Sequence, residues 1–124
     1  MRGFVSKGAQ MKLISAVVRP FKLQEIRAAL ASHEVFSITV GEVRGYAGAT
    51  SAAVEFYRGA IYTEHFLPKV KVEIVVGDNM VPLVMEAVQH AAWTGKPGDG
   101  AVYVQDLVEV MPVTGTGVPD IDAA

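Results

Sequence analysis

The sequence predicts an α+β fold of the ferredoxin-like type, in which βαββαβ order gives a four-stranded antiparallel sheet with two helices on one face. Four short segments have the apolar, β-branched pattern of strands, and two segments between them have helical periodicity. The chain has 124 residues, 51% of them hydrophobic and 19% charged, which is sufficient for one domain with a core. We place that domain at residues 11–112.

The first half of the pattern follows residues 1–10, which we expect to be an extension outside the domain. Residues 12–18, KLISAVV, predict a strand that stops before Pro20, because proline cannot continue a central ladder. Apolar residues then recur at helical spacing over 23–32. Alternation of isoleucine and valine with threonine and glycine predicts a second strand over 36–46.

The segment 47–66 is too long for a compact domain to keep without a function. Residues 47–53 are small and bury too little surface to offset the entropy of ordering them, so we expect them to be mobile. The rest of the segment holds Tyr57, Arg58 and Tyr62, residue types that are common at interface anchors. The segment therefore predicts a recognition loop, with packing of its aromatic rings onto the domain as the open alternative.

The second half of the pattern begins with residues 69–76, KVKVEIVV, a strand with one apolar face and one charged face. A helix is expected over 79–94, where the following Gly95 ends it. Residues 101–110 predict the fourth strand, and 113–124 a C-terminal tail. Two short helices cover only one face of the sheet, so self-association is the expected way to bury the other face.

Composition excludes several classes of function. The formal net charge is −2, which gives no concentrated basic face for nucleic acid. Cysteine is absent, which excludes disulfides and thiolate metal sites and fits a reducing cytoplasm. No apolar run approaches the roughly 20 residues of a membrane-spanning helix, so we expect no direct membrane insertion and a cytoplasmic location.

The most distinctive local motif is TGKPGDG at residues 94–100, between a predicted helix and a predicted strand. Its three glycines allow successive amides to converge as an anion-binding nest. It is not a Walker loop, because the lysine follows the first glycine and no helix starts after the last. A glycine helix cap followed by a tight Gly-Asp-Gly turn explains the motif equally well, so both interpretations stay open.

Catalytic residues are not indicated by the sequence. Glu64 and His65 are adjacent, so on a strand they would point to opposite faces, and no nucleophile stands beside a base. No two of the histidines His33, His65 and His90 have the spacing of metal ligands. The chain is therefore not expected to be an enzyme, and a metal-binding trimer of the same fold is kept as the alternative.

Five ordered segments are similar to the motifs of the PII signal-transduction family. They are KLISAVVRPFKL at 12–23, TVGEVRG at 39–45, YRGAIY at 57–62, FLPKVKVE at 66–73 and TGKPGDG at 94–100. This resemblance implies a homotrimer with nucleotide sites in the clefts between subunits. It also implies that residues 47–66 are a T-loop, which docks on an ammonium channel or an enzyme of nitrogen metabolism.

The resemblance also implies the residues of the nucleotide site. It would comprise Thr39, Gly45, Glu73 and Ile74 around the base, Gly98, Asp99 and Gly100 at the phosphates, Lys69 at 2-oxoglutarate, and Tyr46, Thr94, Gly95, Lys96 and Pro97. Tyr62 matches a tyrosine that some members carry as a uridylylation site, and Arg58 matches the loop arginine that enters the channel.

The chain departs from the family pattern at three cations. Ala101 replaces the lysine after Gly-Asp-Gly, and residues 112–114 lack the family's arginine pair. We therefore expect ADP or AMP as the ligand rather than ATP. The glutamine that helps to hold Mg²⁺ and 2-oxoglutarate has no counterpart in 48–53, which argues against both. The function implied is a trimeric regulator that controls a partner, such as a membrane transporter, through its T-loop.

Overall fold

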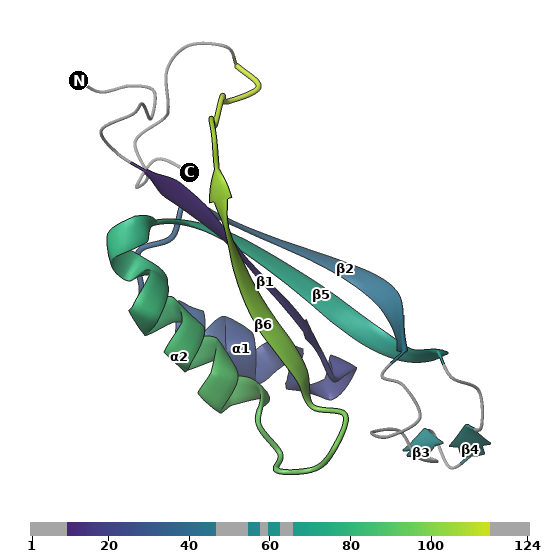
Figure 1. Ribbon diagram of the computed structural model, residues 1–124. Helices are drawn as coiled ribbons and strands as arrows, with labels where there is room; N and C mark the ends of the chain where they lie inside the picture. Colours follow the sequence, from purple (N-terminus) through teal and green to yellow (C-terminus); the bar gives the residue numbers. More distant parts are fainter. Residues whose placement is uncertain (1–9, 47–54, 58–59, 63–65, 115–124) are drawn as a thin grey trace.

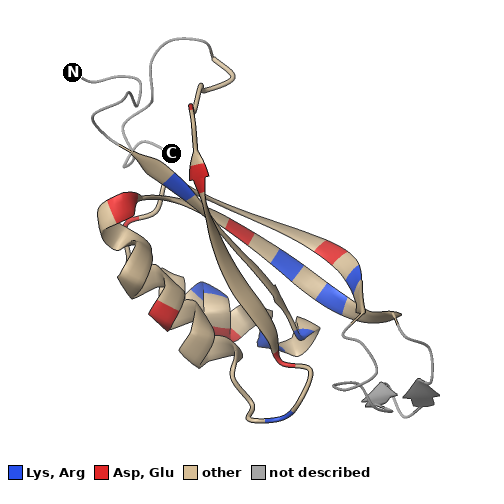
Figure 2. Cartoon of the chain, viewed as in Figure 1, with Lys and Arg blue, Asp and Glu red and all other residues tan. Residues whose placement is uncertain are grey.

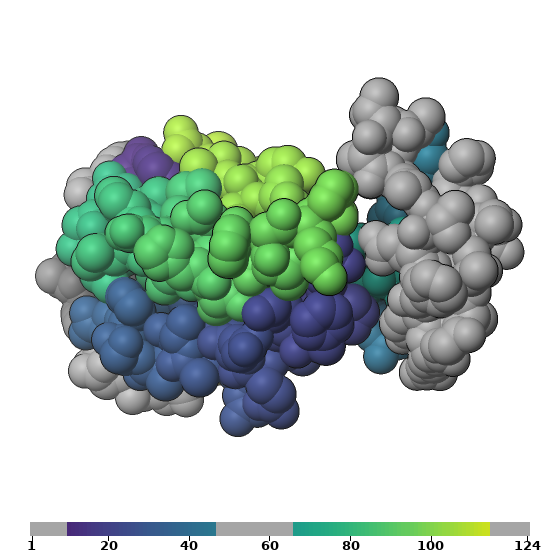
Figure 3. Space-filling model, turned by 90° about the horizontal axis from the view of Figure 1, so that it is seen from below, coloured from purple at the N-terminus to yellow at the C-terminus, as the bar shows by residue number. Residues whose placement is uncertain are grey.

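The computed structural model describes residues 10–46, 55–57, 60–62 and 66–114 (Figure 1). Its main element is an antiparallel sheet in the order β2-β5-β1-β6, formed by β1 (Met11–Val18), β2 (Ser37–Tyr46), β5 (Phe66–Gly77) and β6 (Gly100–Leu107). Helices α1 (Leu23–Leu30) and α2 (Val81–Ala92) lie side by side on one face (Figures 1 and 3). The predicted ferredoxin-like βαββαβ fold is confirmed.

The core lies between this sheet and the two helices. Ile14 and Ile74 face each other across β1 and β5, and both are fully buried. They pack in one cluster with Ile26 of α1 and with Val84 and Val88 of α2. Full burial of each such side chain contributes about 1.5–3 kcal/mol, so this layer supplies most of the driving force for folding.

The edge strand β2 departs from the alternating pattern that predicted it. Ile38 and Val40 lie opposite buried residues of β5, but 40% and 46% of their surfaces remain exposed. The two helices therefore do not cover the edge strand fully. His90 of α2 is likewise exposed.

The strand bounds differ from the predicted ones for reasons of pairing. β5 begins at Phe66, before the predicted start at Lys69, because β2 continues to pair with it as far as Tyr46. Pro68 is tolerated there because β1 ends opposite Val70, leaving one side of β5 without a neighbouring strand. β6 ends at Leu107 and not at 110, because its partner β1 starts at Met11.

The helices are also shorter than predicted. The first was expected over 23–32 and ends at Leu30, and a 3₁₀ turn over Pro20–Lys22 precedes it. The second was expected over 79–94 and spans Val81–Ala92, after a 3₁₀ turn over Asp78–Met80. In each case the first predicted turn or the last one is not α-helical, as is common at helix ends.

The loop predicted over 47–66 contains secondary structure that its sequence did not indicate. Strands β3 (Glu55–Tyr57) and β4 (Ala60–Tyr62) pair as a small antiparallel hairpin beside the end of β2 and β5 (Figure 1). The predicted mobility of 47–53 concerns residues outside those that the structure describes.

The face of the sheet opposite the helices carries both charged and apolar side chains. Lys69, Lys71 and Glu73 lie on this open face, as the pattern of β5 predicted, and Lys71 and Glu73 form an ion pair of 3.6 Å. Figure 2 shows that β2 and β5 carry both basic and acidic residues, which are placed toward the end of the sheet that leads to β3 and β4. Among the described residues, no helix is long and apolar enough to cross a membrane.

Candidate functional site

A cavity of about 450 Å³ lies on the open face where β1 ends. The last residues of β2, the first residues of β5 and the loop between α2 and β6 meet there. Several residues that the resemblance assigned to a nucleotide site line it: Gly45, Tyr46, Lys69, Lys96, Gly98, Asp99 and Gly100. Val17, Ala101 and Tyr103 complete the wall, so the fold brings together groups that are more than 50 positions apart along the chain.

Lys69 is the most buried charged residue of this pocket, with 9% of its surface exposed. Its Nζ donates a hydrogen bond of 2.7 Å to the carbonyl oxygen of Gly98. Gly45 leaves room for the lysine stem, since an added Cβ at Gly45 would lie 3.2 Å from Lys69 Cγ. The ammonium group is thereby held against the loop at Gly98.

Tyr46 ends β2 at the rim of the pocket. Its ring lies 5.5 Å from the ring of Phe66, between centroids, with the planes inclined by 38°. Tilted aromatic pairs at this separation are attractive. This contact holds together the two chain ends between which residues 47–65 run, and it links the pocket wall to that segment.

The loop over residues 94–100 is organised around the carboxylate of Asp99. Asp99 Oδ2 accepts hydrogen bonds from the amides of Thr94 at 2.7 Å and Gly95 at 3.0 Å, and Oδ1 accepts one from the Thr94 hydroxyl. The amide of Lys96 donates to Thr94 Oγ1 at 3.2 Å. The amides of Thr94 and Gly95 thus converge on an anion of the chain itself, and the helix cap is Trp93, not the predicted Gly95.

These contacts also fix the ionisation of Asp99. Burial acts to raise the pKa of its carboxyl group, but hydrogen bonds from Thr94, Arg19 and Gly95 outweigh burial and hold the pKa well below its usual range. The carboxylate form of Asp99 is therefore favoured by its contacts in the folded protein.

The stability of the fold should depend on pH through this group. A carboxyl whose pKa is depressed by folding stabilises the protein above its unfolded pKa of about 3.9, and that contribution is lost as the pH falls below it. We expect Asp99→Asn to lower the free energy of unfolding at pH 7 and to have a progressively smaller effect below about pH 4. Urea titrations across this range measure the difference. A difference that stays constant down to pH 3 would contradict it.

Six residues of the predicted site do not line this cavity: Thr94, Gly95 and Pro97 of the adjacent loop, and Thr39, Glu73 and Ile74 of the sheet. Thr39 and Glu73 face each other across β2 and β5, and Glu73 is four residues, or about 13 Å, along the strand from Lys69. The side chain of Ile74 is fully buried under the helices, on the other face of the sheet. Only its backbone could contact a ligand on the open face.

The predicted partner residues fall on the hairpin or outside the described part of the chain. Tyr57 ends β3 and Tyr62 ends β4, while Arg58 lies outside the described residues. Among the described residues, no group of three histidine, cysteine or acidic side chains could hold a metal ion. His33 Nδ1 instead lies 3.1 Å from the Ala29 carbonyl oxygen at the end of α1.

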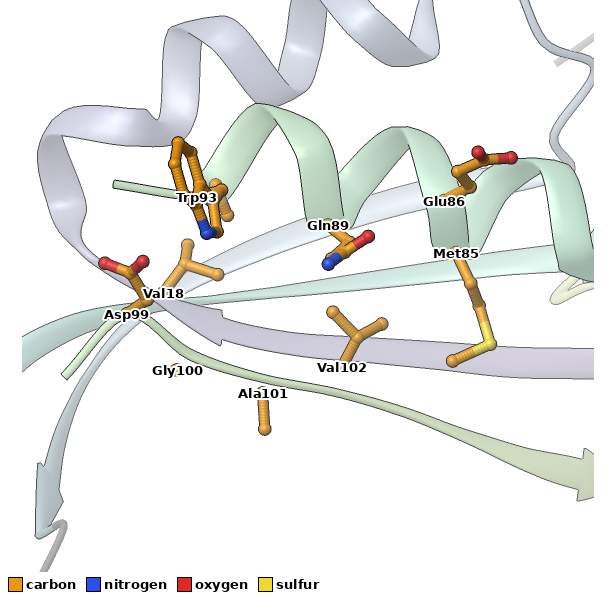
Figure 4. A pocket seen from close by; sticks show the side chains of 10 residues that line it. Val18, Met85, Glu86, Gln89, Trp93, Asp99, Gly100, Ala101 and Val102 are labelled. Carbon is orange, nitrogen blue, oxygen red and sulfur yellow. The ribbon is translucent and has the colours of Figure 1, made fainter. Parts of the chain in front are cut away.

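A second cavity of about 460 Å³ lies on the helix side of β6 (Figure 4). Met85 and Gln89 line it from α2, Trp93 from the position after that helix, and Ala101 and Val102 from β6. It shares Asp99, Gly100 and Ala101 with the first cavity. The start of β6 therefore separates two hollows, of which the helix-side one is the more apolar.

Sequence reasoning missed one residue of this region. Arg19 stands in the segment 12–23 with no predicted role in the site, yet its side chain contacts the 94–100 loop at Pro97 and Asp99. No local pattern could have revealed the contact, because the partners are 80 positions apart. Only the position of Arg19, directly after a strand, marks it as lying at an end of the sheet.

The fold and the pocket define a small βαββαβ domain with a ligand-sized cavity beside a glycine-rich loop. A sequence model described as "Nitrogen regulatory protein P-II" matches residues 11–116. The chain belongs to the nitrogen regulatory protein P-II family, whose members are regulatory signal-transduction proteins and not enzymes.

Individual relatives match over most of their length. A nitrogen regulatory protein P-II of Bradyrhizobium diazoefficiens is 43% identical over 113 residues, covering 91% of this chain and 99% of the relative. GlnK of Escherichia coli is 42% identical over 110 residues, covering 89% and 96%. A crystal structure of Arabidopsis thaliana PII bound to citrate superposes with a TM-score of 0.66 at 32% identity, covering 88% of this chain and 90% of that one.

Proposed function

We propose that this P-II protein senses an adenine nucleotide with fewer phosphates than ATP, namely ADP or AMP, in the pocket beside the 94–100 loop. Three copies would associate as a homotrimer, with the pocket in the cleft between neighbours. Residues 47–66 would report occupancy to a partner protein such as a membrane transporter. The protein would be cytoplasmic, with any membrane association made through that partner.

The observation that carries this proposal is the small number of cationic side chains in the pocket. Lys69 and Lys96 supply two cations, and the one carboxylate among the lining residues, Asp99, is paired with Arg19. Ala101 stands in the pocket wall at the position of the family's lysine. A charge-assisted hydrogen bond contributes roughly 1.5–3 kcal/mol, so a pocket with fewer cations should favour a ligand with fewer phosphates.

The trimer is supported by the open face and by the spread of the predicted site. This face carries the apolar side chains of Leu13, Val17 and Val75 with no layer over them in a single chain. Thr39 and Glu73, expected at the base, lie about 13 Å along the sheet from Lys69. This separation fits a site in which one copy contacts the base and its neighbour contacts the phosphates.

Isothermal titration calorimetry tests the choice of ligand, with separate titrations of ATP, ADP, AMP and citrate, each with and without Mg²⁺ and 2-oxoglutarate. Citrate is included because it is bound in the Arabidopsis PII crystal structure. We expect ADP or AMP to bind more tightly than ATP, and Mg²⁺ with 2-oxoglutarate to add little. ATP that binds most tightly, and only with both of them, would contradict the proposal.

Restoring the missing cation should shift the preference. Ala101→Lys places an ammonium group in the pocket wall, and we expect it to tighten ATP binding about ten-fold or more relative to AMP. The matched control is Gln105→Lys, which adds the same charge to the same face of β6 away from the pocket. Equal effects of the two variants would show that the gain comes from net charge and not from the pocket.

A further inference from the structure

Arg19 joins the end of β1 to the 94–100 loop through two different atoms. Its Nε donates to Asp99 Oδ1 at 2.9 Å, and its Nη2 donates to the carbonyl oxygen of Pro97 at 2.7 Å. The ion pair is mostly buried, with 13% and 21% of the two side chains exposed. A planar guanidinium group that makes two directed bonds fixes orientation as well as distance.

Asp99 in turn holds the other half of the same loop. Its carboxylate accepts from the amides of Thr94 and Gly95, while Arg19 holds it from the opposite side. The chain from Arg19 through Asp99 to Gly95 therefore spans the loop from its last residues to its first.

The contacts of the Pro97 and Gly98 carbonyls also determine the direction of the amide N–H groups that follow them. The Pro97 carbonyl points at Arg19 and the Gly98 carbonyl points at Lys69. The peptides are trans, so each amide N–H lies antiparallel to the carbonyl of its own peptide unit. The N–H groups of Gly98 and Asp99 are therefore directed away from the two cations, as a pair of donors whose direction Arg19 and Lys69 set.

We propose that Arg19 is a positioning residue, which with Asp99 clamps the 94–100 loop in the conformation that presents these amides. Arg19 does not line the cavity itself. Its effect on an anionic ligand is transmitted through the loop, and that consequence rests on the proposed function, whereas the clamp itself does not.

The experiment compares Arg19→Lys with the wild-type protein, by hydrogen exchange of single amides followed by NMR in the absence of ligand. Lysine keeps the charge but cannot donate to Asp99 and Pro97 in the same fork. We expect the amides of Thr94 and Gly95 to exchange about ten-fold faster in the variant, because local opening of the loop becomes easier. Thr94→Val, which removes the hydroxyl contacts to Asp99 and to the Lys96 amide, should have the same direction of effect at Gly95.

The control is Arg27→Lys, on the exposed face of α1, for which no change in these amides is expected. Calorimetry with ADP is then run on the same samples, and a roughly ten-fold weaker affinity of Arg19→Lys is expected. Unchanged exchange at Thr94 and Gly95 would overturn the clamp. Faster exchange with unchanged ADP affinity would overturn its role in positioning.

Failure of the proposed function has a different signature. A wild-type protein that binds none of the nucleotides would refute the proposed ligand, and the exchange rates alone would then decide whether the clamp exists. Amide exchange across β1 and α2 is recorded in the same spectra. An increase there as large as that at the loop would mean that Arg19 acts on global stability and would also overturn the proposal.

Discussion

Replacing Gly100 by alanine should lower the free energy of unfolding by about 3 kcal/mol. Gly100 starts β6 with φ of +107°, a backbone conformation that residues with a side chain rarely adopt. An added Cβ would also lie 1.9 Å from the carbonyl oxygen of Val17. That oxygen belongs to the central strand and cannot rotate away. The start of β6 would have to separate from β1, so both cavities that share Gly100 would change shape.

The comparison for this variant is Gly41→Ala in β2, where an added Cβ meets nothing within 4 Å. We expect its effect to stay within about 0.5 kcal/mol. Urea unfolding followed by circular dichroism measures both variants at one protein concentration, because self-association would shift apparent stability. Similar stabilities of the two variants would show that the start of β6 can shift without loss.

Truncation of the core at Ile74 should have an equally large effect. Ile74 is fully buried between Ile14 and the two helices, so Ile74→Ala leaves a cavity and is expected to cost about 3–4 kcal/mol. Its neighbour on the other side, Ile38, is 40% exposed and lies directly opposite it in β2. We expect Ile38→Ala to cost about 1 kcal/mol, because less apolar surface returns to water.

The pair separates burial from strand propensity, since both changes remove the same atoms from adjacent strands. Chemical denaturation of the two variants and of the wild type gives the comparison directly. If Ile38→Ala were as damaging as Ile74→Ala, another layer would have to cover β2 in solution. Given the open edge of the sheet, the oligomeric state of that sample would then be measured by sedimentation.

The sequence was sufficient for the order of the two long helices and of the four strands of the main sheet, and for the faces of β5, but not for the hairpin of β3 and β4. Alternation along residues 69–76 predicted which side chains lie under the helices, and the buried residues Val72 and Ile74 confirm it. The ends of the elements were harder to predict. β5 starts at Phe66 because β2 and Tyr46 extend to meet it, which is a property of the partner strand and not of β5.

The sequence indicated the loop of the candidate site but not the contacts that organise it. The glycines over 94–100 indicated a loop that could gather amides, whereas its actual anion is the chain's own Asp99. Arg19 could not be assigned to the loop, because their contact is created by the packing of the sheet. The glycines show that the backbone of this loop can adopt unusual conformations, whereas contacts with distant residues determine which conformation it adopts.

The early end of β1 has a mechanical consequence. Strand β5 pairs with β1 only from Val70 onward, so its first residues, Phe66 to Lys69, pair with β2 alone. A two-stranded ribbon twists more easily than a sheet of four strands. The cavity lies across this boundary, with Gly45 on the compliant ribbon and Gly100 on the stiff sheet. A molecule bound there would contact both parts, and would thereby restrict the twisting of the two strands that lead to the β3 and β4 hairpin.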